Sequence, residues 1–449
     1  MIHRFEFDGD KIVLDVNSGA LHKVDKPAWE LLELYPSGPS PEDLKRLGRS
    51  YDPSEIRGAC REIEQLIDDE LLFSKDRFKE GYSPPENRVL KALCLHLAHD
   101  CNLRCVYCFA GQGFYGGDSE LMSLEVGKAA LDFVIERSNG RRKLDVDFFG
   151  GEPLLNFEVL KQLVEYGYER GQKKDKELLF TVTTNAVLLT PDVKRYLQDN
   201  HICAVLSLDG TPEVHNKTRI FPGGTGSYDI VARNISRYVQ TAPDDNYYIR
   251  GTFTRNNLKF TEDALHMADL GAKNISLEPV VGKPCEKYAL REEDLPYVCE
   301  EYENLARALL KRALDGDPVS FFHFNIDLNG GPCLPRRLYG CGAGYEYLAV
   351  APNGDIYPCH QFVGQDDLLL GNVLGDFKIN SFVEDLNECY VYNKEECDSC
   401  WAKFYCSGGC HANAYNLNND IYKPYGLGCI LMRKRIECAL YLKAKLAEQ

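Results

Sequence analysis

The stretch 101–108, CNLRCVYC, places three cysteines within eight residues. It follows the apolar run 93–97, so it lies where a strand gives way to a loop. Thiolates of Cys101, Cys105 and Cys108 can hold three irons of a [4Fe–4S] cluster and leave the fourth iron open to a small molecule. A zinc site is the alternative, but zinc normally takes four ligands, and no fourth cysteine or histidine follows closely downstream. The spacing therefore favours an iron–sulfur cluster.

Bulk composition narrows the class of protein. The chain has 449 residues and a formal net charge of −16. It has no apolar run of the roughly 20 residues that a membrane-spanning helix needs. Lysine and arginine are scattered, whereas a nucleic-acid surface needs them clustered. We therefore expect a soluble cytoplasmic protein of two or three domains that binds neither nucleic acid nor membrane.

Eighteen cysteines are many for a chain without a secretory signal, where disulfides are disfavoured. Ten of them are clustered, three within 101–108 and seven within 341–429, and we expect these to be ligands. The other eight are isolated in the sequence. We expect most of them to be small core residues: Cys60, Cys94, Cys203, Cys285, Cys299, Cys333, Cys389 and Cys438.

Residues 88–325 alternate short β-type runs with longer amphipathic stretches. This alternation predicts parallel strands joined by right-handed helical crossovers. Six strand–helix units are too few for a closed eight-unit barrel, so we expect an α/β fold built on a partial (β/α)6 barrel of the TIM type. The expected strands are 93–97, 145–149, 179–184, 204–208, 248–253 and 274–277.

Two features of this segment together resemble the radical S-adenosylmethionine (SAM) superfamily. One is the C-x3-C-x2-C spacing with an aromatic residue before the last cysteine, and the other is the sequence FGGEP at 149–153. The resemblance implies that the open iron binds SAM and that one-electron reduction of SAM gives a 5′-deoxyadenosyl radical. It also implies the SAM contacts: Gly150, Gly151 and Glu152 at the amino group, Thr183 and Asn185 near the ribose, Ser207 and Arg219 at the carboxylate, and Tyr107 on the adenine side.

Residues 326–449 are rich in cysteine and poor in long periodic runs, so metal clusters could replace part of a hydrophobic core there. Zinc ribbons are one explanation, because a C-x2-C pair fits them. The order of seven cysteines resembles the SPASM extension of peptide-modifying radical SAM enzymes, which implies two auxiliary [4Fe–4S] clusters and three clusters in all. By this resemblance the distal cluster takes Cys397, Cys400, Cys406 and Cys429, and the nearer cluster takes Cys341, Cys359 and Cys410.

The nearer set lacks a fourth thiolate. In the sulfatase-maturing relatives a cysteine slightly upstream completes it, but this chain has Pro335 at that position. Either Cys333 serves instead, or the iron is open to a substrate thiol, as sulfur crosslinking needs. Those relatives also place an aspartate base directly after the cysteine that matches Cys359. The chain has His360 there, which argues against oxidation to an aldehyde.

Residues 1–80 are expected to form a hairpin at 12–24 followed by three short helices. The first helix starts near Pro27, Ser40 caps the second, and the third carries an apolar stripe over 56–67. This order resembles the winged-helix-like peptide chaperone of pyrroloquinoline quinone biosynthesis, which implies that a leader peptide binds as an added strand. A DNA-binding winged helix is the alternative, and the acidic third helix disfavours it.

The three segments, 1–80, 88–325 and 326–449, together resemble the maturases of "six cysteines in forty-five residues" (SCIFF) peptides. The resemblance implies an oxidoreductase-type enzyme that joins cysteine sulfur to an acceptor carbon, possibly of threonine, in a Cys-rich ribosomal precursor. It also implies a reductant such as ferredoxin or flavodoxin. Two alternatives stay open: a radical enzyme that forms carbon–carbon crosslinks or aldehydes, and a non-catalytic iron–sulfur electron carrier or sensor. The sequence assigns no catalytic residue beyond the cluster ligands.

Overall fold

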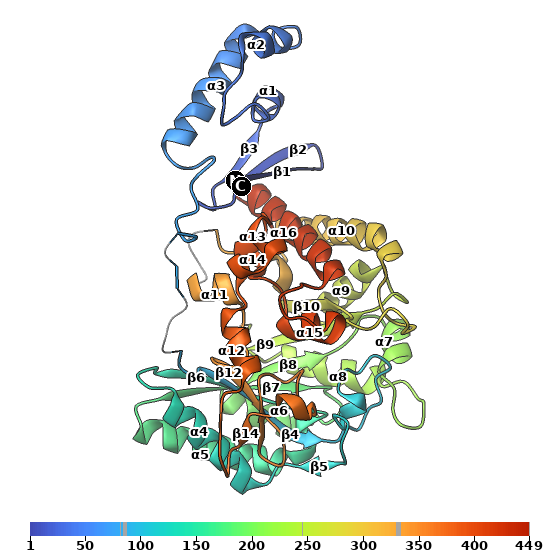
Figure 1. Ribbon diagram of the computed structural model, residues 1–449. Coiled ribbons are helices and arrows are strands. Elements are labelled where there is room, and N and C mark those ends of the chain that lie inside the picture. Colours follow the sequence, from blue (N-terminus) through green and yellow to red (C-terminus); the bar gives the residue numbers. More distant parts are fainter. Residues whose placement is uncertain (81, 84–87, 245, 329–333, 449) are drawn as a thin grey trace.

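The computed structural model describes residues 1–80, 82–83, 88–244, 246–328 and 334–448. Figure 1 shows a small N-terminal sheet with its helices above a much larger sheet. The cysteine-rich C-terminal region lies between them and along one side of the large sheet. The two chain ends lie side by side, and the side chains of Lys23 and Glu448 form an ion pair of 2.6 Å there.

The N-terminal part is a three-stranded antiparallel sheet with helices on one face. Its predicted hairpin and three helices are confirmed, and Ser40 caps the second helix by accepting a hydrogen bond from the backbone N–H of Asp43. The first strand was not predicted, although alternation of Phe5 and Phe7 with polar residues indicates it. The elements are β1 (Ile2–Phe7), β2 (Asp10–Asp15), β3 (Leu21–Val24), α1 (Lys26–Leu31), α2 (Pro41–Leu47) and α3 (Pro53–Asp68).

The other face of this small sheet is buried against the rest of the protein. Phe5, Phe7, Ile12 and Leu14 belong to the main hydrophobic core. The Phe7 ring stacks on Tyr441 with ring centroids 3.9 Å apart. Burial of four large apolar side chains stabilises this contact by several kcal/mol, on the order of 1.5–3 kcal/mol for each fully buried side chain. The N-terminal part is therefore packed onto the C-terminal helix rather than tethered loosely.

The large sheet confirms the predicted partial barrel. All six predicted strands are present, parallel and adjacent, in the order β10-β9-β8-β7-β6-β4. Helices follow the strands as crossovers, as the alternating sequence pattern predicted. The strands are β4 (Ala92–His99), β6 (Lys143–Gly150), β7 (Glu177–Thr184), β8 (Cys203–Ser207), β9 (Tyr247–Phe253) and β10 (Asn274–Pro279). The helices are α4 (Leu124–Arg137), α5 (Phe157–Lys173), α6 (Pro191–Asp199), α7 (Pro212–Thr218), α8 (Tyr228–Val239), α9 (Phe260–Asp269) and α10 (Leu295–Leu314).

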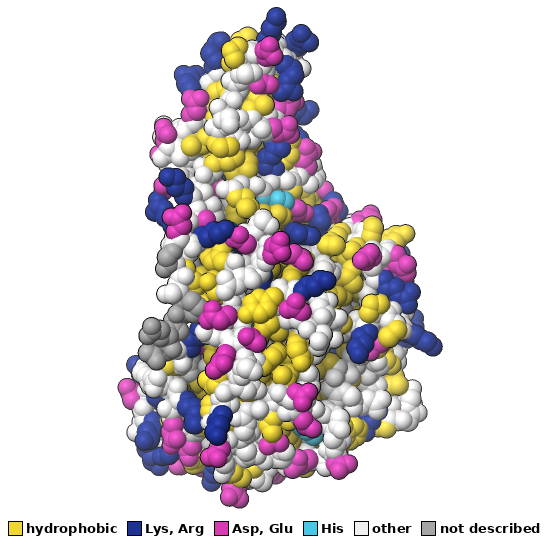
Figure 2. All heavy atoms as spheres, viewed as in Figure 1, with side chains coloured by type: hydrophobic (Ala, Val, Ile, Leu, Met, Phe, Trp, Pro, Cys, Tyr) yellow, Lys and Arg dark blue, Asp and Glu magenta, His cyan; other side chains and the backbone are white. Residues whose placement is uncertain are grey.

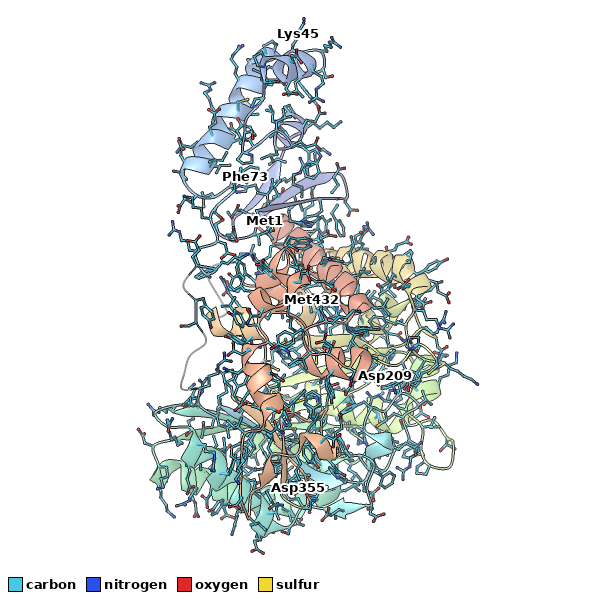
Figure 3. All side chains as sticks on the ribbon, viewed as in Figure 1. Met1, Lys45, Phe73, Asp209, Asp355 and Met432 are labelled. Atoms are coloured by element: carbon cyan, nitrogen blue, oxygen red, sulfur yellow. The ribbon has the colours of Figure 1, made fainter. Side chains whose placement is uncertain are left out.

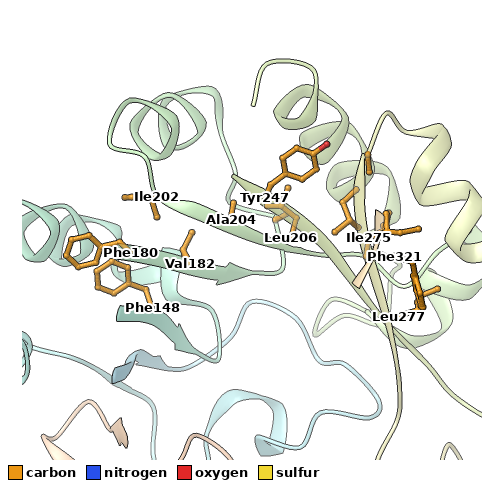
Figure 4. Close-up of a cluster of buried hydrophobic side chains, with 14 of the residues drawn as sticks. Phe148, Phe180, Val182, Ile202, Ala204, Leu206, Tyr247, Ile275, Leu277 and Phe321 are labelled. Carbon is orange, nitrogen blue, oxygen red and sulfur yellow. The ribbon is translucent and has the colours of Figure 1, made fainter. Parts of the chain in front are cut away.

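The two faces of this sheet differ in burial. Side chains toward the helices are fully buried, as in the cluster of Figure 4 that includes Phe148, Val182, Leu206, Ile275 and Leu277. The alternate side chains, which face the concave side, are mostly only partly buried. Because successive side chains of a strand point to opposite faces, this pattern indicates an accessible lumen rather than a filled barrel.

The C-terminal region extends the barrel sheet instead of forming a separate layer. Strand β12 (Tyr347–Val350) pairs in parallel with β4, and β13 (Asp355–Tyr357) and β14 (Gly371–Asn372) continue that edge. At the other edge β11 (Ser320–Phe321) pairs with β10, and β5 (Glu120–Leu121) pairs with the end of β4. The helices are α11 (Leu334–Tyr339), α12 (Ser381–Glu388), α13 (Glu395–Asp398), α14 (Lys403–Cys406), α15 (His411–Asn418) and α16 (Gly426–Leu446).

The surface carries charges of both signs. In Figure 2 lysine and arginine are interspersed with aspartate and glutamate over the visible face, as the scattered sequence pattern predicted. Among the described residues, no helix combines the length and the apolar character required to cross a bilayer.

Candidate functional site

The three cysteines of the 101–108 loop lie together after strand β4. Burial, together with the charges of Glu152, Cys105 and Cys108, raises the pKa of Cys101 to about 12. Burial likewise raises the pKa of Cys105 to about 11, against a lowering by Arg219. The three thiols therefore lie close enough for their charges to interact, and a bound cation would favour their thiolate forms. Among the described residues, no three His, Cys, Asp or Glu side chains converge on a single metal-ion position.

The glycine-rich element passes very close to strand β4. A Cβ on Gly150, whose φ is +122°, would lie 2.3 Å from the carbonyl oxygen of Ala98. A Cβ on Gly151 would lie 2.2 Å from the carbonyl oxygen of Asp100. Only glycine fits such contacts. The two glycines thus bring the backbone of this loop against the start of the cysteine loop.

Glu152 holds this loop from within. It is fully buried, and its carboxylate accepts hydrogen bonds from Leu154 N at 3.0 Å, Thr184 Oγ1 at 2.7 Å and Asn185 N at 2.8 Å. Burial raises its pKa to about 7 despite these donors. Both carboxylate oxygens are occupied within the protein, so Glu152 shapes the loop that was expected to contact SAM.

Asp209 at the end of strand β8 joins two of the predicted residues. Tyr107 donates its hydroxyl to Asp209 Oδ2 at 2.6 Å, and the Arg219 Nε donates to Oδ1 at 2.9 Å. Thr218 and the backbone N–H of Thr252 donate to the same carboxylate. Burial alone would raise the pKa of Asp209, but the charge of Arg219 and these hydrogen bonds hold it below its usual value. Figure 3 labels Asp209, which the sequence analysis did not name as a site residue.

The other predicted contacts face the lumen or the cysteine loop. Asn185 donates to the side chain of Asn102 at 2.7 Å and lies 3.6 Å from the Cys101 sulfur. Thr183 donates to Asp147 at 3.5 Å. Ser207 lies opposite Arg250 in the sheet register, and no hydrogen bond between its side chain and Arg219 occurs within the described chain. The structure therefore brings Tyr107 together with Arg219, and Asn185 with Cys101.

Four C-terminal cysteines line one cavity of about 500 Å³. Its wall comes from helices α13, α14 and α16 and the loops between them. Burial raises the pKa of Cys397 to about 12, and the other three thiols add to the rise through their charges. This is the set that the sequence assigned to the distal cluster: Cys397, Cys400, Cys406 and Cys429.

The nearer set also comes together, from three separate loops. Burial holds the pKa of the Cys359 thiol well above its usual value, and the charges of Cys410 and Cys341 add to this effect. Gln361 donates a hydrogen bond of 3.6 Å to the Cys410 sulfur. Cys333, the candidate fourth ligand, lies outside the described residues.

His360 lies between this nearer set and the lumen. A hydrogen bond of 2.8 Å links its Nδ1 to the hydroxyl of Tyr347, and its ring packs against Phe149 and Phe109. Burial, together with the charge of Arg250, lowers the pKa of His360 to about 4. The imidazole is therefore neutral near pH 7.

The isolated cysteines are only partly as expected. Cys94, Cys389 and Cys438 are fully buried core residues, which confirms the expectation for them. Cys60, Cys203 and Cys299 are half-buried. Cys285 is exposed, so the expectation was wrong for that residue, whose loop carries no large apolar neighbour in the sequence.

Asp147 gives a testable pH dependence. Burial raises the pKa of Asp147 to about 7. In the unfolded chain this carboxyl has the ordinary aspartate pKa near 4, so between about pH 4 and 7 it is protonated only in the folded protein. The stability of the folded state should therefore fall as pH rises from about 4 to about 7. In Asp147→Asn this loss is absent, and above pH 7 the variant should be more stable, by on the order of 2 kcal/mol. Melting temperatures of both proteins from pH 5 to 8.5 test this. The exposed Asp192→Asn serves as control, and parallel curves for Asp147→Asn and wild type would contradict the prediction.

Comparison with known proteins agrees with this site. A family model described as "4Fe-4S single cluster domain" matches residues 91–229. The mycofactocin maturase MftC of Mycolicibacterium smegmatis is 29% identical over 75% of this chain and 81% of its own. The radical SAM cyclopropyl synthase TigE of Paramaledivibacter caminithermalis is 22% identical over 93% of this chain and 91% of its own.

Two solved structures share the fold. One is native anSMEcpe with bound AdoMet and Kp18Cys peptide, with a TM-score of 0.64, 22% identity, and coverage of 80% of this chain and 99% of that chain. The other is Streptococcus suis SuiB bound to the precursor peptide SuiA, with a TM-score of 0.55, 16% identity, and coverage of 95% and 98%. The chain thus resembles radical SAM peptide maturases in sequence and has their fold.

Proposed function

We propose that this chain is a cytoplasmic radical SAM enzyme that forms thioether crosslinks in a Cys-rich ribosomal precursor peptide. The observation that carries the proposal is the meeting of Cys341, Cys359 and Cys410 beside the barrel lumen, in addition to the thiols of the 101–108 loop. Enzymes that only generate a radical need the first set. A second thiol set next to the lumen suits a reaction in which substrate sulfur is bound and activated.

The residues present fit the groups that this function needs. Cys101, Cys105 and Cys108 would hold the SAM-binding cluster, and the close-packed backbone of Gly150 and Gly151 would cradle SAM with the remaining predicted contacts. The two C-terminal sets would hold the auxiliary clusters, with Cys333 or a substrate thiol completing the nearer one. When bound, the first cluster and SAM supply a carbon-centred radical by one-electron reduction. The chain itself positions the peptide in the lumen and keeps bulk water away from it.

The N-terminal part, residues 1–80, would bind the leader of the precursor. Strand β3 is an edge of its sheet and can accept an added strand, whose main-chain hydrogen bonds would supply affinity. The segments 88–325 and 326–449 would act as the radical-generating barrel and the auxiliary-cluster region. A reductant such as ferredoxin or flavodoxin would supply electrons.

Mass spectrometry of the product tests the proposal. Each thioether removes one hydrogen from the thiol and one from the acceptor carbon, so the peptide should lose about 2 Da per crosslink. The substrate would be a Cys-rich precursor peptide from the genome that carries this gene, incubated anaerobically with SAM and reductant. The number of thiols that iodoacetamide alkylates should fall by one per crosslink. A precursor with serine in place of every cysteine is the control, and an unchanged mass of the natural precursor would refute the proposal.

Aldehyde formation is the second candidate, favoured by the similarity to anSMEcpe. The same experiment separates it, because oxidation of cysteine to an aldehyde removes the sulfur from the peptide. Carbon–carbon crosslinking would lower the mass by about 2 Da while leaving every thiol free to react. Metal and sulfide analysis separates a zinc protein from one with three clusters, which would carry about twelve irons.

A further inference from the structure

The side chain of Arg250 faces the lumen, and its guanidinium has no hydrogen-bond acceptor among the described residues. It lies on strand β9, opposite Ser207 of β8 and Ser276 of β10 in the sheet register. Its neighbours Ile249 and Gly251 face the helices and are buried, so its own side chain faces the lumen. Despite this position in the middle of the sheet, 48% of the side chain is exposed. The lumen therefore reaches the guanidinium.

The nearest acid does not satisfy this guanidinium. Its Nη2 lies 3.7 Å from Glu278 Oε1, which is longer than a hydrogen bond. Glu278 is already engaged, because His323 Nε2 lies 3.1 Å from the same oxygen and Arg435 Nη1 lies 3.8 Å from the other. Within the described part of the chain, the Arg250 guanidinium donates no hydrogen bond.

Charge in this part of the lumen is positive on balance. The acids that face Arg250 are Glu278 and Asp147. Burial raises the pKa of Asp147 to about 7, so only Glu278 is fully ionised near neutral pH. Arg435, which is buried and donates from Nε to the Tyr302 hydroxyl at 2.8 Å, already offsets Glu278. The guanidiniums of Arg250 and Arg435 thus share one fully ionised acid, in a protein whose formal net charge is −16.

A ligand that enters the lumen would displace the water around Arg250. A guanidinium has five N–H donors, and burying them without acceptors is costly. A peptide that brings an oxygen anion to this place replaces the lost water, whereas a peptide with an apolar side chain there does not. Such a site discriminates strongly against the peptide that lacks the group.

We propose that Arg250 anchors a carboxylate of the peptide substrate in the barrel lumen. The assignment rests on the proposed function, which supplies the peptide. The planar guanidinium suits a carboxylate, which it can bind with two parallel hydrogen bonds. Thr252 lies two residues along the same face of β9 and can donate to the same anion. The ligand is a glutamate or aspartate side chain, or the carboxyl terminus of the core peptide.

The cofactor carboxylate is a weaker match for this arginine. Arg250 acts electrostatically on Asp147 and on His360, and His360 directly follows Cys359 of the nearer cysteine set. Arg219, not Arg250, lowers the pKa of Cys105 in the SAM-side loop. Arg250 therefore lies on the side where substrate would meet the nearer set.

Peptide binding to the anaerobically reconstituted enzyme tests the assignment. The probes are synthetic decapeptides with a central cysteine and a single glutamate, which is moved through the other positions in turn. A matched peptide carries glutamine in place of each glutamate. Every peptide is made once with a free and once with an amidated carboxyl terminus. Microscale thermophoresis should show that at least one carboxylate peptide binds wild type about 10- to 100-fold more tightly than its neutral counterpart. Arg250→Gln should abolish this preference, and Arg250→Lys should retain part of it. The control Arg170→Gln, at an ion pair on helix α5, should leave it unchanged.

The arms of the experiment separate the possible outcomes. A preference limited to free termini assigns the site to the peptide end, and one limited to glutamate assigns it to a side chain. Equal binding of carboxylate and neutral peptides by wild type overturns the proposal. SAM affinity, measured by equilibrium dialysis, should change less than twofold in Arg250→Gln, and a tenfold loss would assign the arginine to the cofactor instead. If the preference holds but no precursor loses mass, the proposed function fails and the carboxylate site stands.

Discussion

Replacing Cys105 by alanine is expected to abolish SAM cleavage and to lower the iron content by about four per chain. Cys105 lies in the shared pocket with Cys101 and Cys108, and two thiolates cannot hold the cluster that three hold. The C-terminal sets are built from other loops, so their iron should remain. Iron and sulfide analysis, together with the release of 5′-deoxyadenosine under reducing conditions, measures both effects.

The matched control is Cys438→Ala. Cys438 lies on helix α16 and is fully buried in the main core. Its replacement should leave iron content and SAM cleavage unchanged and cost roughly 1 kcal/mol of stability for the small cavity. A Cys105→Ala protein that keeps all its iron would contradict the assignment of the first set, and so would a Cys438→Ala protein that loses four irons.

Asp209→Asn is expected to lower the free energy of unfolding by about 3–5 kcal/mol. The substitution keeps the shape of the side chain but leaves the buried Arg219 guanidinium without its counter-ion. It also weakens the hydrogen bond that holds Tyr107. Because the pKa of Asp209 is held below its usual value, its stabilisation is fully present at pH 7 and is lost only as pH falls through the folded-state pKa. The difference between variant and wild type should therefore narrow in acid.

Thermal unfolding of the metal-free proteins measures this effect. The control is Asp132→Asn, the same substitution at the Arg170 ion pair on the surface, which should cost less than about 1 kcal/mol. The double variant Asp209→Asn with Arg219→Gln should recover part of the loss, because it removes the unpaired charge. Equal effects of Asp209→Asn and Asp132→Asn would show that the buried pair does not organise the site.

The local sequence was sufficient to predict features that depend on the residues of a single helix or strand. The six barrel strands and the three N-terminal helices were predicted because apolar periodicity and capping residues such as Ser40 are encoded within a few residues. The requirement for Gly150 and Gly151 was also visible, although the structure shows that strand β4 itself imposes it. Strand β1 was missed, because its alternation is short and its side chains pack against distant segments that carry Arg307, Trp401 and Tyr441.

Contacts between distant segments were decided only by the tertiary structure. The sequence named Tyr107 and Arg219 but not Asp209, which joins them, because an aspartate in a Leu-Asp-Gly turn looks the same whether it is solvated or paired. The sheet register likewise places Ser207 opposite Arg250, a neighbour that the sequence did not reveal.

The cysteine motif at 101–108 also combines features that the local sequence determines with features that only the tertiary structure determines. The spacing in 101–108 by itself determined which three thiols form a set, because they lie in one short loop. The surroundings of that set depend on residues more than about 40 positions away: Glu152 and Asn185 against the loop, and Arg250 across the lumen. Charge compensation and burial arise only when strands pack side by side. For that reason the sequence predicted the cluster ligands, and only the tertiary structure revealed the positively charged lumen beside them.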